Sequence, residues 1–335
     1  MRLSLRSLTL TLVAALLAGL ALLPAAQPAA AGVVPSTITV TTTAIENTDG
    51  NGCSLYEALQ ASFNGAPYHQ CSAGDSDNLI VFGGSAAAGT ISMPVGPGSL
   101  DLPMINRSVT ITGPVIISGG GAQGDLHIFR IAPGGTLNLA NLALKDAHSS
   151  GGGAAILDTN RGTINALGVA FINNVADGDG GAINSNGAVN IVGGSFMGNQ
   201  ALGLMPDKSN NPGTGYGGAI HVDGYETLKL VLTNFSGNLA DKGGGAVHYS
   251  GKSADVSDTV FSGNLVNGTG SDSSAPKGGG AFYADSDVTV TFTRSAFSGN
   301  LTPTSNGGAL YTAISATGVI STTSFNGNIA ASPGN

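Results

Sequence analysis

The feature that most constrains this chain is a pattern that recurs six times between Gly151 and Asn328. Each copy opens with Gly-Gly-Ala and closes with Phe-x-x-Asn. The opening alanines are Ala154, Ala182, Ala219, Ala246, Ala281 and Ala309, which lie 27 to 37 residues apart. The closing pairs are Phe171/Asn174, Phe196/Asn199, Phe235/Asn238, Phe261/Asn264, Phe297/Asn300 and Phe325/Asn328. A period in this range is typical of stacked structural repeats.

The residues inside each copy favour strands over helices. Residues 228–232 and 288–292 alternate apolar and polar residues with a period of two, as a strand with one buried face does. About 27 residues accommodate three short strands and three turns, and coils stacked at about 4.8 Å form parallel sheets. We therefore predict an all-β fold, a right-handed single-stranded parallel β-helix, which is a solenoid with a short N-terminal capping helix.

Strand alternation assigns a direction to each side chain. If Ile220 points inward, Val222 does too, and Ala219, His221 and Asp223 face solvent. The inward column is apolar and consists of Ile183, Ile220, Val247, Phe282 and Leu310. We expect the phenylalanines to form a second internal stack. The asparagine amides are expected to bond to the neighbouring coil as a structural ladder of Asn174, Asn199, Asn238, Asn264, Asn300 and Asn328.

The pairing of Gly-Gly-Ala-Ile with Phe-x-x-Asn resembles the repeat of the polymorphic outer membrane proteins, a surface-exposed β-helix family. The resemblance covers roughly the C-terminal half of the chain. It implies a β-helix at a bacterial cell surface. Members of that family end in a membrane β-barrel, and we do not expect one in this sequence.

The first residues read as a secretory signal peptide. Arg2 and Arg6 precede an apolar run, Pro24 breaks that run, and small residues around Ala31 suit cleavage, which gives a signal peptide at 1–31. The alternative is an uncleaved membrane anchor, for which about 16 apolar residues is short. We therefore expect a secreted or cell-surface protein, with no transmembrane span after cleavage.

The segment after the signal peptide is expected to cap one end of the solenoid. Ser54 and Glu57 fit a capping box at the start of a short helix, with Leu55, Leu59 and Phe63 forming its apolar stripe. Two cysteines in a secreted chain, Cys53 and Cys71, suggest one disulfide, the alternative being half of a metal site.

The run from Cys53 to Ala58 resembles the CSLREA element that begins many bacterial extracellular β-helix proteins, with Tyr56 where that family has Arg. A helix over the open end of a β-helix blocks association of its unpaired edge. We assign 32–82 to this N-terminal cap segment with its disulfide and 83–335 to the parallel β-helix, whose regular repeats span 151–328.

Charge narrows the range of partners. The chain has 12 basic and 20 acidic residues, and removing the signal peptide takes away two of the basic ones. An acidic chain whose basic residues are scattered singly argues against nucleic-acid binding.

A candidate binding face follows the Gly-Gly-Ala strands. Its ligand-binding residues are His221, Asp223, His248, Tyr283, Asp285 and Tyr311. Two long insertions, 200–216 and 265–277, project at one corner beside it. Rings flanked by carboxylates suit polysaccharide stacking and hydrogen bonding. The alternative is that these residues favour strands and stack well for structural reasons alone.

We therefore expect a non-catalytic protein that serves adhesion, envelope structure or contact with a polysaccharide or another surface component. The alternative is a carbohydrate-active enzyme, a polysaccharide lyase or glycoside hydrolase, working in a groove beside the two insertions. We assign no catalytic residue, no metal site and no cofactor, with Ca²⁺ as a weak alternative. An uncapped C-terminal end also predicts end-to-end self-association.

Overall fold

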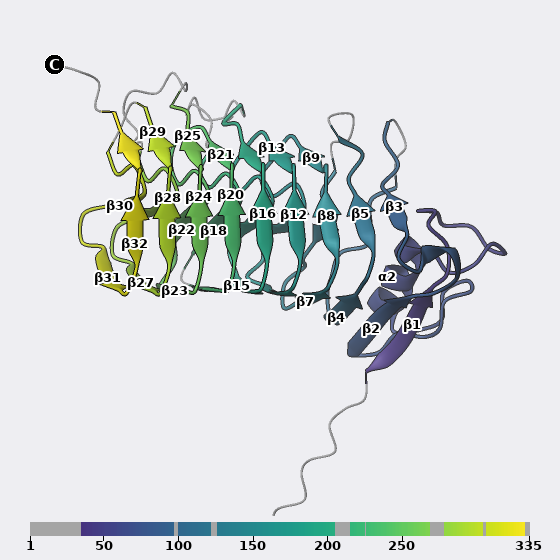
Figure 1. Cartoon of the computed structure of the whole chain (residues 1–335). Coiled ribbons are helices and arrows are strands. Elements are labelled where there is room, and N and C mark those ends of the chain that lie inside the picture. The colour runs from purple at the N-terminus through teal and green to yellow at the C-terminus, as the bar shows by residue number, and fades with distance from the viewer. Residues whose placement is uncertain are drawn as a thin grey trace, which may run out of the picture. The chain divides into compact units, whose positions relative to one another are not determined.

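The computed structural model describes residues 35–96, 100–121, 126–204, 215–224, 226–268, 278–303 and 306–331. They belong to one compact unit, Pro35–Asn335. The predicted signal peptide at 1–31 lies outside the described residues. Within these residues the fold is an all-β parallel β-helix with one α-helix, as predicted (Figure 1).

The longest sheet carries the five-residue strands of successive coils, all parallel. In spatial order its ten strands are β1 (Ser36–Val40), β2 (Asp77–Phe82), β4 (Ser108–Thr112), β7 (Thr136–Ala140), β11 (Thr163–Leu167), β15 (Ala188–Val192), β19 (Thr227–Val231), β23 (Ser253–Ser257), β27 (Thr289–Thr293) and β31 (Thr317–Ser321). It begins with β1 and β2, so strands of the N-terminal segment extend the same sheet as the regular repeats.

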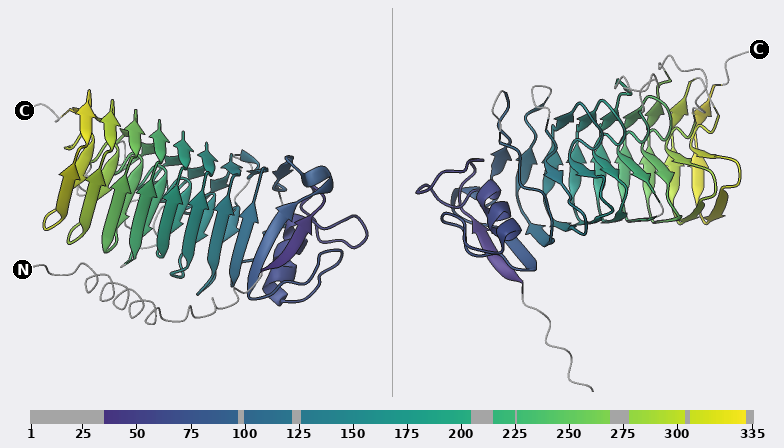
Figure 2. Two further views of the ribbon diagram at one scale, coloured as in Figure 1. Left: turned by 60° about the horizontal axis from the view of Figure 1, so that its bottom comes forward. Right: turned by 180° about the vertical axis from the view of Figure 1, so that it is seen from behind.

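The second sheet carries the phenylalanine column. Its strands are β3 (Thr90–Ser92), β5 (Ile116–Ser118), β8 (Ala143–Lys145), β12 (Ala170–Ile172), β16 (Ser195–Met197), β20 (Asn234–Ser236), β24 (Val260–Ser262), β28 (Ala296–Ser298) and β32 (Ser324–Asn326). Figure 2 shows from two further sides how these strands follow one another along the stack.

The third sheet consists of an earlier strand, β6 (Phe129–Arg130), and the strands that follow each Gly-Gly-Ala. The latter are β10 (Ile156–Asp158), β14 (Ile183–Ser185), β18 (Ile220–Asp223), β22 (Val247–Ser250), β26 (Phe282–Ala284) and β30 (Leu310–Thr312).

A fourth sheet corrects the prediction of three strands per coil. Its strands of two residues follow the asparagine corner and are β9 (His148–Ser149), β13 (Val175–Ala176), β17 (Gln200–Ala201), β21 (Leu239–Ala240), β25 (Leu265–Val266), β29 (Leu301–Thr302) and β33 (Ile329–Ala330). Two residues are too few to show an alternating pattern, so the sequence period did not reveal this side.

The interior is built from the two predicted apolar columns. Phe196 stacks on Phe235 with ring centroids 4.8 Å apart, and Phe235 stacks on Phe261 at 4.9 Å. The column after Gly-Gly-Ala keeps Ile220 and Val247 fully buried. Residues that lie 26 to 39 positions apart in sequence are therefore vertical neighbours in the core.

The asparagines form a continuous hydrogen-bonded ladder. The side chain of Asn238 donates to the carbonyl of Phe196 at 3.1 Å and to the amide oxygen of Asn264 at 2.9 Å. Its own amide oxygen accepts from the backbone N–H and the side chain of Asn199, both at 3.0 Å. Asn238 is completely buried, so this ladder satisfies the polar groups of a buried corner.

In the last five openings the two glycines are required for different physical reasons. The first glycine has φ between +64° and +69° at Gly180, Gly217, Gly244, Gly279 and Gly307, a region that favours glycine. The second lies against the next coil, where a Cβ on Gly245 would collide with the carbonyl oxygen of Gly280. Repetition of both residues therefore keeps the coils in close contact.

The N-terminal segment folds over one end of the stack. Its helix α2 (Leu55–Asn64) starts with the predicted capping box, in which the Ser54 side chain accepts from the Glu57 N–H and the Glu57 carboxylate accepts from the Ser54 N–H. Leu55 and Leu59 are buried, whereas Phe63, expected in the same apolar stripe, is 41% exposed. A short 3₁₀ helix, η1 (Gly84–Ala86), follows β2.

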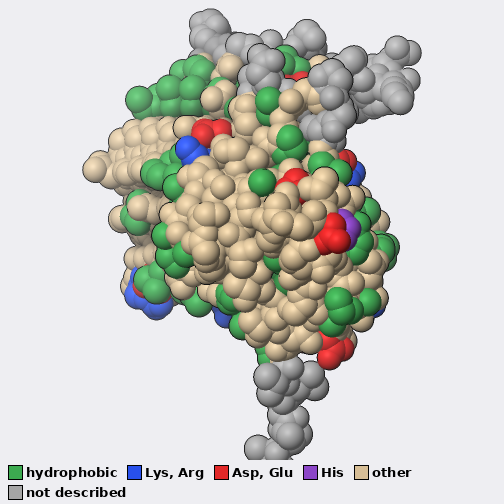
Figure 3. All heavy atoms as spheres, turned by 90° about the vertical axis from the view of Figure 1, so that its right-hand side faces the viewer, with side chains coloured by type: hydrophobic (Ala, Val, Ile, Leu, Met, Phe, Trp, Pro, Cys, Tyr) green, Lys and Arg blue, Asp and Glu red, His purple; other side chains and the backbone are tan. Residues whose placement is uncertain are grey.

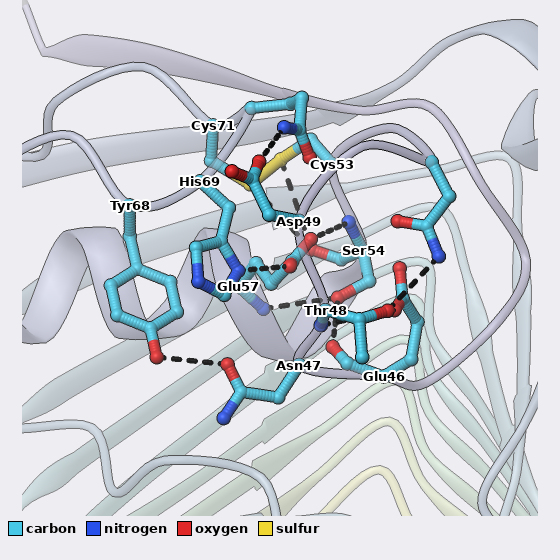
Figure 4. Close-up of polar contacts among 12 residues, drawn as sticks. Glu46, Asn47, Thr48, Asp49, Cys53, Ser54, Glu57, Tyr68, His69 and Cys71 are labelled. Carbon is cyan, nitrogen blue, oxygen red and sulfur yellow. Dashed lines mark hydrogen bonds and ion pairs between the residues drawn. A yellow bond between two sulfur atoms is a disulfide. The ribbon is translucent and has the colours of Figure 1, made fainter.

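A disulfide and a polar network tie this segment together. Cys53 and Cys71 form the predicted disulfide. The fully buried carboxylate of Glu57 contacts the Nδ1 atom of His69 at 2.6 Å, and the Tyr68 hydroxyl donates to Asn47 at 2.8 Å (Figure 4). Seen from this end, hydrophobic side chains are scattered among polar and backbone atoms (Figure 3).

The last described coil presents its interior face to solvent. Phe325 stacks on Phe297 at 4.9 Å, yet Phe325 is 45% exposed and Ile320 is 48% exposed. No described coil covers them. The expected end-to-end association at this edge stays a prediction.

Candidate functional site

The candidate binding residues do form a column. Strand pairing places Asn184, His221, His248, Tyr283 and Tyr311 side by side on β14, β18, β22, β26 and β30. The two imidazole rings stack with centroids 4.8 Å apart and planes inclined by 6°. His248 stacks on Tyr283 at 4.9 Å, and Tyr283 stacks on Tyr311 at 5.1 Å.

Most of this column is not open to solvent, which corrects the expectation that its residues face outward freely. His221 is 8% exposed, His248 is 4% exposed and Tyr283 is 2% exposed. Ala219, also expected at the surface, is fully buried. Tyr311 is half-buried. The rings thus form the wall of a site and do not stand free as an open platform.

Tyr216 is one physical reason for this burial. Its ring centroid lies 4.5 Å from that of His248 and 6.0 Å from that of Tyr283. Asp179 fixes the position of Tyr216, because its Oδ1 atom accepts from the backbone N–H groups of Gly215 at 2.6 Å and Tyr216 at 2.7 Å.

The backbone beside the column leaves room for these rings. Tyr216, Gly243 and Gly278 follow one another as bridged residues directly before their Gly-Gly-Ala openings. A Cβ on Gly243 would meet the rings of Tyr283 and Tyr216 at 3.2 and 3.3 Å, which is a tight contact. The absence of a side chain at Gly243 therefore permits the close packing of both tyrosines.

Two buried nitrogens in this wall lack hydrogen-bond partners. The Nδ1 atoms of His221 and His248 are both inaccessible to solvent and unbonded among the residues that the structure describes. Burial, followed by the proximity of His221, holds the pKa of His248 well below its ordinary value, so its ring is neutral at neutral pH. Each unpaired buried nitrogen costs about 1–3 kcal/mol. A native protein that keeps such groups often does so at a functional site.

A hollow of about 410 Å³ lies beside the column. It is lined by Asp179, Tyr216, His221, Asp223, His248, Ser250, Tyr283 and Asp285. Asp223 pairs in register with Ser250, and Asp285 follows β26 opposite Ser250. The two carboxylates therefore lie two coils apart, about 10 Å along the stack. We call this feature the ring hollow.

The ring hollow is acidic, and the hydroxyl group of Tyr283 in its wall stays protonated. Burial, followed by the Asp285 carboxylate, raises the pKa of Tyr283. Three carboxylates and no Lys or Arg occur among the lining residues. No group of three or more His, Cys, Asp or Glu suited to a metal ion occurs among the described residues.

A second hollow, of about 640 Å³, is less suited to a ligand. Its lining includes Asp146 and His148. Lys145 pairs with Asp146 at 3.1 Å, and His148 contacts Asp177 at 3.4 Å. Charged groups there already have partners within the chain, unlike the two nitrogens in the ring hollow.

Parts of both predicted insertions lie outside the described residues, at 205–214 and 269–277. The alternative enzymatic groove beside 200–216 and 265–277 thus lies partly outside them too. Sequence reasoning missed the roles of Asp179 and Tyr216. A signal was present, since Tyr216 occupies the position before Gly-Gly-Ala that is glycine in the next two coils.

A scan of protein families matches residues 168–186 to the Chlamydia polymorphic membrane protein (Chlamydia_PMP) repeat. The matched stretch includes Phe171, Asn174 and the Gly180–Gly181–Ala182 opening. No curated protein and no solved structure matches the chain. Together with the stacked parallel strands, this match points to a β-helix protein of a surface-associated or outer-membrane type.

The structure contains no helix, among its described residues, with the length and hydropathy that crossing a membrane requires.

Proposed function

We propose that this chain is a secreted or cell-surface β-helix protein that binds a polysaccharide at the ring hollow without cleaving it. The observation that carries this proposal is the hollow itself, in which two imidazole and two tyrosine rings lie beside three carboxylates. Sugar hydroxyl groups both donate and accept hydrogen bonds, so they suit a lining of this kind. The acidic carboxylates at the rim add further acceptors for the same hydroxyls.

The properties of His248 favour binding over catalysis. A general base works best when its pKa lies near the working pH. Burial depresses the pKa of His248 well below the ordinary value, so this ring is a poor proton acceptor near neutrality. The alternative lyase or hydrolase activity is tested with the same saccharides, by assaying reducing ends and unsaturated products.

The test compares binding of a panel of soluble oligosaccharides to the protein and to its His248→Phe variant by calorimetry. Phenylalanine keeps a ring in the stack but removes the unbonded nitrogen. We expect affinity to fall by about tenfold or more, as loss of a buried hydrogen bond predicts. Lys229→Ala, on the exposed face of β19, is the control and should bind like the parent. Equal binding by His248→Phe, or saccharide cleavage by the parent protein, would contradict the proposal.

A further inference from the structure

The charge of the ring hollow indicates more than the general class of its ligand. Of its three carboxylates, Asp179 is engaged in holding Tyr216. Asp223 and Asp285 each accept only from the next backbone N–H, at 2.7 and 2.8 Å, and neither forms an ion pair with a described residue. Asp223 is exposed and Asp285 is half-buried, so both carboxylates remain available at the rim.

The wall beside these carboxylates does not repel a cation. His248 is neutral at neutral pH because burial depresses its pKa. No Lys or Arg occurs among the residues that line the hollow. An anionic sugar such as a uronic acid would instead meet uncompensated carboxylates.

The spacing of the carboxylates fits an extended saccharide chain that runs along the stack. Strand register separates Asp223 from Asp285 by two coils, about 10 Å, with Ser250 between them. This separation is comparable to one disaccharide unit of an extended β-linked polysaccharide. Amino groups on every second sugar would therefore meet the two carboxylates in turn.

We propose that the ligand of the ring hollow is a polysaccharide with free, protonated amino groups, held through Asp223 and Asp285. This inference rests on the proposed function, since it names the chemical class of saccharide that the same site binds. A lysine-rich peptide would satisfy the carboxylates too. The separation of about 10 Å between the carboxylates is comparable to one disaccharide unit, which favours the amino polysaccharide.

The test uses three hexasaccharides of equal length under conditions that keep amines protonated: β-linked glucosamine, N-acetylglucosamine and glucose. Calorimetry should show that the glucosamine oligomer binds about tenfold tighter than the other two, with an affinity that falls as salt increases. Asp223→Asn and Asp285→Asn should each remove most of this preference, so that the glucosamine oligomer binds no tighter than the glucose oligomer does to the same variant. Asp255→Asn, on the exposed face of β23, is the matched control.

The outcomes separate the two proposals. Equal binding of all three hexasaccharides would overturn the preference for amines while leaving saccharide binding intact. Binding of none of them would overturn both. Hexalysine that binds as tightly as the glucosamine oligomer, with the same sensitivity to Asp223→Asn, would overturn the assignment to a saccharide.

Discussion

At the scale of single residues, two columns of the same coils differ in how their buried polar groups are satisfied. Buried amides of the asparagine corner are completely satisfied, because each asparagine bonds to the coils on both sides. On another side of the same coils, His221 and His248 keep buried nitrogens without partners. The first arrangement stabilises the stack, whereas the second costs stability, which is why we assign the binding role to the imidazoles and a structural role to the amides.

His248 should make the fold sensitive to acid. Its pKa in the folded chain lies well below the ordinary 6.5. As pH falls below that ordinary value, the unfolded chain takes up a proton that the folded chain does not, so the free energy of unfolding decreases. The slope for one such group is at most about 1.4 kcal/mol per pH unit. Urea unfolding at neutral and at mildly acidic pH measures this effect. On acidification the free energy of unfolding should decrease less for His248→Phe than for the parent protein.

Tyr311→Phe provides the control for this experiment. It changes the same column without removing a histidine, so it should keep the acid sensitivity of the parent. A parent and a His248→Phe variant that lose equal stability on acidification would show that position 248 does not titrate as burial implies.

At the scale of elements, the corners fix the coil more firmly than the strands do. The strands have two to six residues. Their pairing depends on a constant spacing between successive coils at each corner. Gly-Gly-Ala ensures this because its second glycine touches the backbone of the next coil. The Phe-x-x-Asn corner does so through the ladder of amides.

The Gly245→Ala variant should therefore be destabilised by about 1–3 kcal/mol or more, as over-packing at a rigid contact costs. The added methyl group would collide with the carbonyl oxygen of Gly280. Gly318→Ala in β31 is the matched control, because its Cβ would meet only the Thr312 methyl group at 3.8 Å. The free energy of unfolding of both variants is measured with urea. Equal stability of the two would contradict this role of the Gly-Gly corner.

The elements also show how much of the fold can be predicted from the sequence alone. Its period correctly predicted the stacked parallel coils and the internal phenylalanine column. Single local motifs correctly predicted the capping box and the Cys53–Cys71 disulfide. The fourth sheet escaped detection because its strands are only two residues long.

The candidate site was predicted less completely than the fold. Register placed His221, His248, Tyr283 and Tyr311 in one column, since pairing of equivalent repeat positions determines it. The burial of His248 and Tyr283 depends in part on Tyr216, which departs from the glycine found at the same repeat position in the next two coils. Contacts that arise from a single exceptional residue are not encoded in the period.

At the scale of the whole molecule, stacking is what brings the functional groups together. Asp223 and Asp285 are 62 positions apart in sequence yet lie on the same face two coils apart. The N-terminal helix, the disulfide and the scattered hydrophobic surface distinguish the capped end from the last described coil, whose interior residues are exposed (Figures 1 and 3). Every proposal about the ring hollow depends on this single stack.

Pulsed electron paramagnetic resonance between spin labels tests the stack most directly. Labels on Ile116→Cys and on Asn234→Cys, Val260→Cys or Ser324→Cys are separated by four, five and seven coils of one sheet. We predict distances that rise linearly, about 19, 24 and 34 Å, because each coil adds about 4.8 Å. Distances that do not increase in this order would contradict the stacked solenoid and with it the ring hollow. So would distances that differ from the three predicted values by more than the length of the label.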